Sequence, residues 1–115
     1  MSKTRATGSQ AVPLKRVRAA SEMRPHAAQA AEFLKALANE QRLLILCQLV
    51  SGPLTVGQIN ERVPLSQSAL SQHLSVLRDA GIVATARESQ SIWYSLQPGI
   101  TLRVMEALHD EFCKR

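Results

Sequence analysis

Residues 65–81 restrict the fold of this chain most strongly, because both ends of an amphipathic helix can be recognised in them. Ser66 is suited to the N-cap, since its hydroxyl can accept a hydrogen bond from a free N–H of the first turn. Gly81 is suited to the position after the last turn, where a left-handed backbone is common. Apolar side chains recur at helical spacing, at Leu70, Leu74 and Leu77. We therefore predict a helix over about residues 67–80 with one face in the core.

The opposite face of this helix is rich in short amide and hydroxyl side chains rather than in Lys and Glu. Such side chains can donate and accept hydrogen bonds at base edges and phosphates. We interpret the segment as a DNA recognition helix, and the alternative is an ordinary polar surface helix. The candidate DNA-binding residues are Ser66, Gln67, Ser68, Ser71, Gln72, His73 and Arg78. His73 lies at the margin of the apolar stripe, so we expect it to pack or to contact a phosphate.

Three further helices are predicted before this one. The first starts at about residue 22 or 25 and ends at 37, the second covers 40–50 after Asn39 as N-cap, and the third covers 56–63 after Thr55. The helix 40–50 is apolar nearly all round, so we expect it to be central and Cys47 to be buried with it. A short helix, a tight turn and a helix with a polar outer face are typical of a helix-turn-helix.

After Gly81 the hydrophobic period changes to about two. We predict strands over 82–86 and 91–96, with residues 87–90 as the tip of a hairpin. A hairpin directly after a recognition helix is a wing, and Arg87 there can reach a phosphate or the minor groove. The alternative for Arg87 is an ion pair with Glu88.

A last helix over about 100–112 has a long apolar face, and only the first helix remains to cover it. A DNA-binding protein with one recognition helix per chain usually binds two half-sites as a dimer. We therefore expect the first and last helices to form a dimer interface. The predicted fold is mainly α with a small β-hairpin. It is a winged helix-turn-helix of about five helices and a two-stranded wing.

The net charge of +5 is concentrated at the N-terminus. Residues 1–24 contain six basic side chains and one acidic one, whereas residues 25–115 are balanced. We expect residues 1–20 to be a disordered basic tail and residues 21–115 to be the DNA-binding and dimerisation domain. A basic tail suggests an anionic partner, although it can also be merely solvated. With no apolar run long enough to span a bilayer and no secretory signal, we expect a cytoplasmic protein without a membrane partner.

Residues 31–112 resemble the ArsR/SmtB family of winged-helix repressors, most clearly at 37–46, 65–74, 77–83 and 93–96. The resemblance implies a homodimer on a palindromic double-stranded operator, released by an inducer. One metal site of that family needs a Cys-x-Cys motif before the recognition helix, where residues 54–59 have no thiol or imidazole. Another needs two ligand pairs on the last helix, which offers His109, Asp110 and Glu111 but lacks the first pair near its start. We therefore predict neither a metal nor another cofactor.

Cys47 and Cys113 are placed as in the dithiol subgroup of this family. By resemblance, the two thiols lie close together within one subunit. A reactive sulfur species or oxidant would join them through a disulfide or a longer polysulfide bridge, and DNA affinity would fall. The chemistry requires thiolate attack by one cysteine and resolution by the other.

Several alternatives remain open at this point. The two cysteines can be inert packed thiols. His109 can complete a Cys₂His site with them, which would make the protein a metal-responsive repressor. A third alternative is a winged-helix DNA-binding or anti-silencing module that senses nothing. We do not expect an enzyme, because Cys113 and His109 lack an oxyanion motif and a third orienting group.

Overall fold

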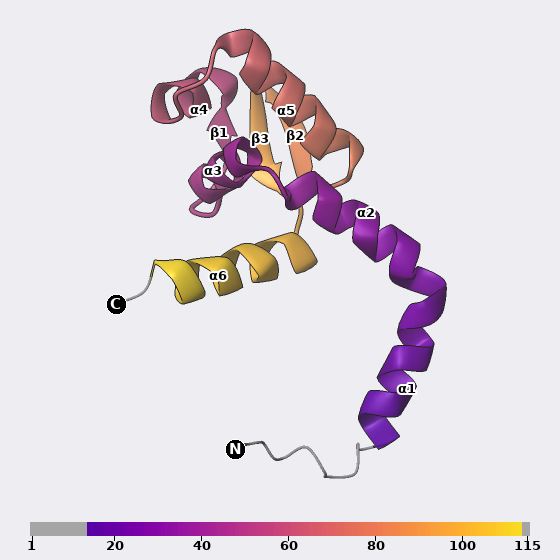
Figure 1. Ribbon diagram of the computed structural model, residues 1–115. Coiled ribbons are helices and arrows are strands. Elements are labelled where there is room, and N and C mark those ends of the chain that lie inside the picture. Colours follow the sequence, from indigo (N-terminus) through magenta and orange to yellow (C-terminus); the bar gives the residue numbers. More distant parts are fainter. Residues whose placement is uncertain (1–13, 114–115) are drawn as a thin grey trace. The chain divides into compact units, whose positions relative to one another are not determined.

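The computed structural model describes residues 14–113, with side chains from Arg18 onward (Figure 1). The elements, in chain order, are α1 (Leu14–Met23), the 3₁₀ helix η1 (Arg24–His26), α2 (Ala27–Leu37), α3 (Glu40–Leu49), β1 (Leu54–Thr55), α4 (Val56–Arg62), α5 (Gln67–Asp79), β2 (Val83–Glu88), β3 (Ser91–Leu96) and α6 (Ile100–Phe112). The residues up to Ala31 form one unit and those from Glu32 form another.

The N-terminal unit is helical where the sequence predicts disorder. Residues 14–20 lie in α1, while residues 1–13 of the predicted tail are outside the described residues. The α1 sequence has neither Gly nor Pro and consists mostly of Leu, Lys, Arg and Ala, which all favour helix. Pro25 lies in the first turn of η1, where a missing N–H leaves no hydrogen bond unmade. The helix that the sequence predicts up to residue 37 therefore starts as α2 at Ala27.

The second unit contains a three-stranded antiparallel sheet with the order β1-β3-β2. In the hairpin, Val83 pairs with Leu96 and Glu88 pairs with Ser91, so the tip is only two residues long. The predicted tip at 87–90 was therefore too long. Strand β1, which pairs Leu54 with Tyr94, was not predicted.

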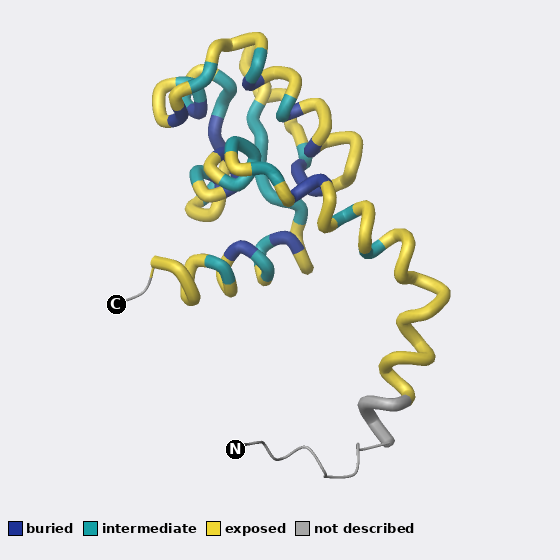
Figure 2. The backbone as a smooth tube through the Cα atoms, in the orientation of Figure 1, coloured by how far each residue is buried: buried dark blue, intermediate teal, exposed yellow. Residues whose placement is uncertain are grey.

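The core of this unit lies between α3, α4, α5 and the sheet (Figure 2). Its fully buried side chains are Ile45, Leu46, Leu49, Ile59, Leu70, Leu74, Leu77, Ile82 and Val83. Burying each such side chain contributes about 1.5–3 kcal/mol. Helix α6 adds Met105 to this core, and α3 packs against both α5 and β3. The predicted inward stripe of residues 70, 74 and 77 is confirmed.

Side-chain caps set the starts of three helices as predicted. The Asn39 side chain accepts a hydrogen bond from the Arg42 N–H, and the Ser66 hydroxyl accepts one from the Ala69 N–H. Thr55 and Gln58 form a reciprocal capping box at α4. Gly81 has a φ of +74°, the left-handed conformation expected after α5. No helix in residues 14–113 is long and apolar enough to cross a membrane.

Candidate functional site

Helix α5 presents a polar face to solvent. Its three core leucines hold it against the unit, while the side chains of Gln67, Ser68, Ser71 and Gln72 are all exposed. Ser66 is exposed too, although its oxygen already caps the helix. A hydroxyl can accept and donate at once, so its proton remains available to a phosphate. These side chains are free of the core, and their entry into a DNA groove stays a prediction.

The turn before α5 is fixed by a residue that sequence reasoning missed. The Asn60 side chain, in the last turn of α4, donates a hydrogen bond to the Leu65 carbonyl oxygen at 2.8 Å. This contact joins the two helices of the helix-turn-helix just before the N-cap of the second. An amide in the last turn before a Pro-containing turn was the only signal for it in the sequence.

His73 does not point freely from the polar face. It is half-buried, and its Nδ1 accepts a hydrogen bond from Arg42 Nε at 3.4 Å. The contact accords with the packing role expected for His73, and a phosphate contact through its other nitrogen stays a prediction. Arg78 and Asp79 are exposed at the C-terminal end of α5. Because Asp79 would repel phosphates, we expect the N-terminal half of the helix to approach DNA most closely.

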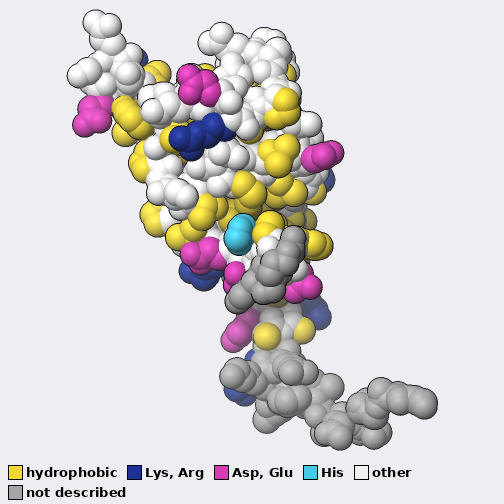
Figure 3. Space-filling model, turned by 90° about the vertical axis from the view of Figure 1, so that its left-hand side faces the viewer, with side chains coloured by type: hydrophobic (Ala, Val, Ile, Leu, Met, Phe, Trp, Pro, Cys, Tyr) yellow, Lys and Arg dark blue, Asp and Glu magenta, His cyan; other side chains and the backbone are white. Residues whose placement is uncertain are grey.

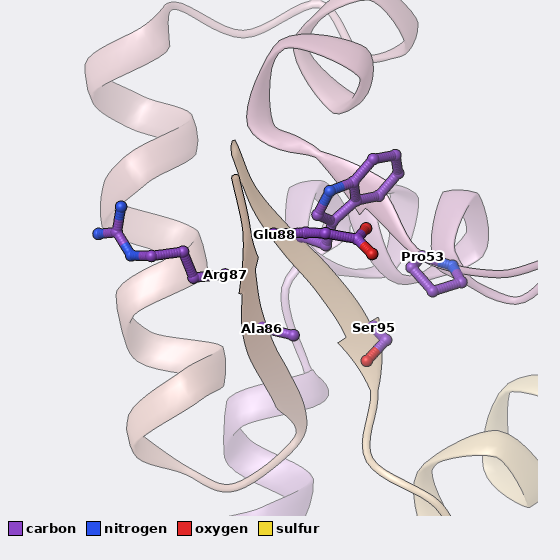
Figure 4. Close-up of a pocket in the computed structure, with 6 residues that line it drawn as sticks. Pro53, Ala86, Arg87, Glu88 and Ser95 are labelled. Carbon is purple, nitrogen blue, oxygen red and sulfur yellow. The ribbon is translucent and has the colours of Figure 1, made fainter. Parts of the chain in front are cut away.

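Arg87 lies on the wing and points to the side of the hairpin on which α5 lies (Figure 4). Glu88 points to the opposite side, because successive residues of a strand alternate between its faces. Within residues 18–113 the one ion pair joins Lys35 to Glu32, so the alternative pair between Arg87 and Glu88 is absent. An open pocket of about 410 Å³ borders this hairpin and is lined partly by Pro53 and Trp93.

The two cysteines are brought together on a different surface. Cys47 of α3 and Cys113, just after α6, line one pocket of about 190 Å³. The other lining residues are Leu43, Met105, Leu108, His109 and Phe112. Both cysteines are free. Burial raises the pKa of the Cys47 thiol, and the negative charge that Cys113 acquires on ionisation raises it further, so the two sulfurs are within electrostatic reach.

The predicted burial of Cys47 was wrong. The residue is exposed, because α3 turns Ile45, Leu46 and Leu49 toward the core and Cys47 toward α6. Pocket walls nevertheless replace part of the water around its sulfur. The two thiols therefore have both a common environment and access to solvent, a combination that inert core cysteines lack.

Apolar side chains remain exposed on α6 and on α2. Phe112 is 77% exposed, Ile100 is 53% exposed and Leu34 of α2 is 57% exposed. In the view of Figure 3, hydrophobic side chains lie at the surface around a histidine, with acidic and basic side chains beside them. Exposed apolar groups of this size are typical of surfaces that another chain covers.

His109 lines the thiol pocket beside both cysteines, yet the arrangement gives little support to a metal site. In the part of the chain that the structure describes, no group of three or more His, Cys, Asp or Glu side chains is placed to hold a metal ion.

Comparison with known proteins relates the fold to gene regulation. Residues 39–85 match the model of the bacterial regulatory proteins of the arsR family. The chain is 46% identical over 93 residues to the transcriptional activator HlyU of Vibrio cholerae serotype O1, which covers 81% of this chain and 86% of that protein. The relatives are transcriptional regulators and not enzymes.

Solved structures agree. The transcriptional repressor BigR from Xylella fastidiosa has a TM-score of 0.74 and 36% identity, covering 83% of this chain and 97% of that one. A homodimeric winged helix-turn-helix DNA-binding domain, Mb0332 from Mycobacterium bovis, has a TM-score of 0.68 and 28% identity, covering 74% and 79%. The chain, a DNA-binding transcriptional regulator with a winged helix-turn-helix, therefore belongs to the ArsR family.

Proposed function

We propose that this regulator is a homodimeric repressor whose operator affinity is switched by reactive sulfur species or oxidants through Cys47 and Cys113. The observation that carries the proposal is the pocket that both free thiols line, between α3 and α6. A disulfide between them requires Cα atoms about 4.4–6.8 Å apart, and a polysulfide bridge spans a longer distance. Their exposure lets a small reagent reach them.

The chemistry balances with either class of inducer. With a persulfide, one thiolate takes the outer sulfur and releases a thiolate, and the second cysteine then displaces hydrosulfide to close a disulfide. With a peroxide, the first thiolate becomes a sulfenic acid and releases hydroxide, and the second thiol displaces water. If each cysteine first takes an outer sulfur from a persulfide, the terminal sulfur of one attacks the inner sulfur of the other, which closes a trisulfide and releases hydrosulfide.

The bridge would act on DNA through helix packing. It would fix α3 to the end of α6, while α3 also packs against α5. If the exposed apolar residues of α2 and α6 meet a second copy, a change between α3 and α6 alters the spacing of the two α5 helices. Two half-sites one helical turn apart, about 34 Å, tolerate little change in that spacing.

Each copy would read one half-site of a double-stranded operator. The proposed contacts are Ser66, Gln67, Ser68, Ser71, Gln72, His73 and Arg78 on and around α5, with Arg87 on the wing. The short side chains of α5 would face base edges and phosphates, and Arg87 would reach the backbone beside them.

DNA binding of matched reduced and treated samples tests the switch. The reduced protein first selects its DNA from random fragments, and affinity is then measured after polysulfide, after peroxide and after re-reduction with dithiothreitol. We expect a loss of about 5–150-fold that dithiothreitol reverses. Cys47→Ser and Cys113→Ser should each bind the same DNA and show no loss.

Mass spectrometry of the same samples identifies the bridge that each reagent forms. A response that survives in both single variants would place the switch elsewhere. Affinity that changes only with Zn²⁺ would favour the metal-responsive alternative, and affinity indifferent to every reagent would favour a module that senses nothing.

A further inference from the structure

Arg42 joins three helices in the second unit. Its Nη1 donates a hydrogen bond to the Ala36 carbonyl oxygen in α2 at 2.9 Å. Its Nε donates to His73 Nδ1 in α5 at 3.4 Å, while the residue itself lies in the first turn of α3. Its backbone N–H is held by the Asn39 cap at 3.0 Å. The side chain is thus the polar link between the end of α2, the start of α3 and the middle of the recognition helix.

The Ala36 carbonyl oxygen and His73 Nδ1 both need a hydrogen-bond donor, and the Arg42 guanidinium supplies it. Ala36 is buried in the last turn of α2, where carbonyl groups have no partner within the helix, so the guanidinium caps that end. His73 is half-buried, and acceptance at Nδ1 leaves its proton on Nε2. Within the described residues 18–113, Arg42 has no carboxylate partner. Its fork of donors therefore serves to orient two neutral groups.

The same helix carries the thiol. Cys47 follows Arg42 by five residues, which places the two side chains about 140° apart around α3. One side of α3 therefore holds Cys47 in the pocket with α6, and another holds Arg42 against α5. A shift or rotation of α3 caused at the pocket must move Arg42 too.

We propose that Arg42 is the positioning residue through which a change at the thiol pocket reaches the recognition helix. This inference rests on the proposed function for its input, the thiol reaction. The second part, the orientation of α5 by the contact from Arg42 to His73, depends only on the hydrogen bonds of Arg42. A lysine in place of Arg42 would keep the charge but has no planar fork to serve both acceptors.

The test separates the thiol reaction from its effect on DNA. In Arg42→Lys, Arg42→Gln and His73→Leu, mass spectrometry should show that polysulfide converts the two cysteines as in the unaltered protein. The ratio of the DNA affinity of the reduced protein to that of the treated protein should nevertheless fall by about 5-fold or more. This ratio measures the coupling between the thiol pocket and DNA binding, and the variants remove the link that carries it. His73→Asn, which restores an acceptor near Nδ1, should recover part of the ratio.

Lys35→Gln is the matched control, since Lys35 is a cation one residue before Ala36 whose only ion pair is exposed. It should leave the ratio unchanged. An unchanged ratio in Arg42→Lys and Arg42→Gln would overturn the proposal. So would a His73→Leu variant that weakens reduced and treated binding equally, because that result is expected of a residue that only contacts DNA.

Failure of the proposed function gives a different pattern. If the unaltered protein shows no thiol response, reduced DNA binding still tests Arg42 through a double-mutant cycle with His73. We then expect the double variant to bind no more weakly than His73→Leu alone, since the link between Arg42 and His73 is already lost in that variant. Additive losses would show that the two residues act separately and would overturn the inference.

Discussion

At the scale of single residues, the two thiols are the most informative groups, because Cys113 lies near enough to affect the pKa of Cys47. Cys47 lies partly out of water, so its pKa is raised first by burial and then by the nearby Cys113. The thiolate is the reactive form. The fold therefore keeps Cys47 protonated to a higher pH than an ordinary thiol and limits its reaction with weak oxidants.

Cys113→Ser should make Cys47 react faster with iodoacetamide at a fixed pH below its pKa. Removing the second thiol removes the like charge, so the pKa of Cys47 falls and its thiolate fraction rises. The pKa stays above that of an ordinary thiol, since burial is the larger cause. Alkylation rates of Cys47, measured by mass spectrometry over a range of pH, give its pKa in each protein. In both proteins the rate should rise as the pH is raised through this pKa.

The matched control is a thiol in an unfolded chain, measured in urea, where the second cysteine should make no difference. A midpoint that does not move in the folded Cys113→Ser protein would contradict the close approach of the two sulfurs.

The exposure of Cys47 shows that hydrophobic periodicity did not predict which side of α3 is buried. Helix α3 has apolar side chains nearly all round. The sequence therefore does not indicate which of its faces is buried. The packing of α5 and the sheet makes that choice and turns Ile45 and Leu49 inward. The side of α3 that remains, with Leu43 and Cys47, becomes the wall of the thiol pocket.

At the scale of elements, the N-cap of α5 serves both the fold and the proposed reading of DNA. Ser66→Ala should lower the free energy of unfolding by about 0.5–2 kcal/mol, because it removes the hydroxyl that accepts from the Ala69 N–H. Ser66→Asp keeps an acceptor and suits the helix dipole, so stability should stay near that of the unaltered protein. Its carboxylate, however, should weaken DNA binding by repelling phosphates.

Urea unfolding and DNA titration of the same samples separate the two effects. Ser71→Ala is the control, since Ser71 is exposed on the same face without a capping bond, and its stability should change by no more than about 0.5 kcal/mol. Equal unfolding midpoints for Ser66→Ala and the unaltered protein would contradict the capping role.

Elements with strong local signals could be predicted, and those defined by distant pairing could not. The caps at Asn39, Thr55 and Ser66 set helix starts that the structure reproduces. Strand β1 is two residues long and exists only because β3, far along the chain, pairs with it. The outer half of β2 is exposed on both faces, so no alternation marked Arg87 and Glu88 as strand residues.

At the scale of the whole molecule, charge and apolar surface are separated along the chain. Residues 32–113 contain six basic and eight acidic side chains, while the residues before them carry the positive excess. A single reading helix on such a unit lacks the cationic surface that gives most DNA-binding proteins their affinity. Doubling the reading helix would compensate for this, and the exposed apolar residues of α2 and α6 provide a surface for it.

Leu34→Glu and Ile100→Glu should therefore convert a dimer into a monomer. Burial of such a side chain contributes about 1.5–3 kcal/mol, and a two-fold interface contains each residue twice. The dimer dissociation constant should rise by about a hundredfold or more, and DNA binding should weaken with it, because a monomer holds one half-site. Sedimentation equilibrium over a range of concentrations measures the constant directly.

Ile92→Glu supplies the comparison that makes this result specific. Ile92 is 40% exposed on the wing, away from α2 and α6, so a glutamate there adds the same charge without touching the proposed interface. If Ile92→Glu dissociates the dimer as strongly as the other two, or if all three proteins remain dimeric, the interface lies elsewhere. A thiol bridge between α3 and α6 could then not change the spacing of two recognition helices by the route proposed here.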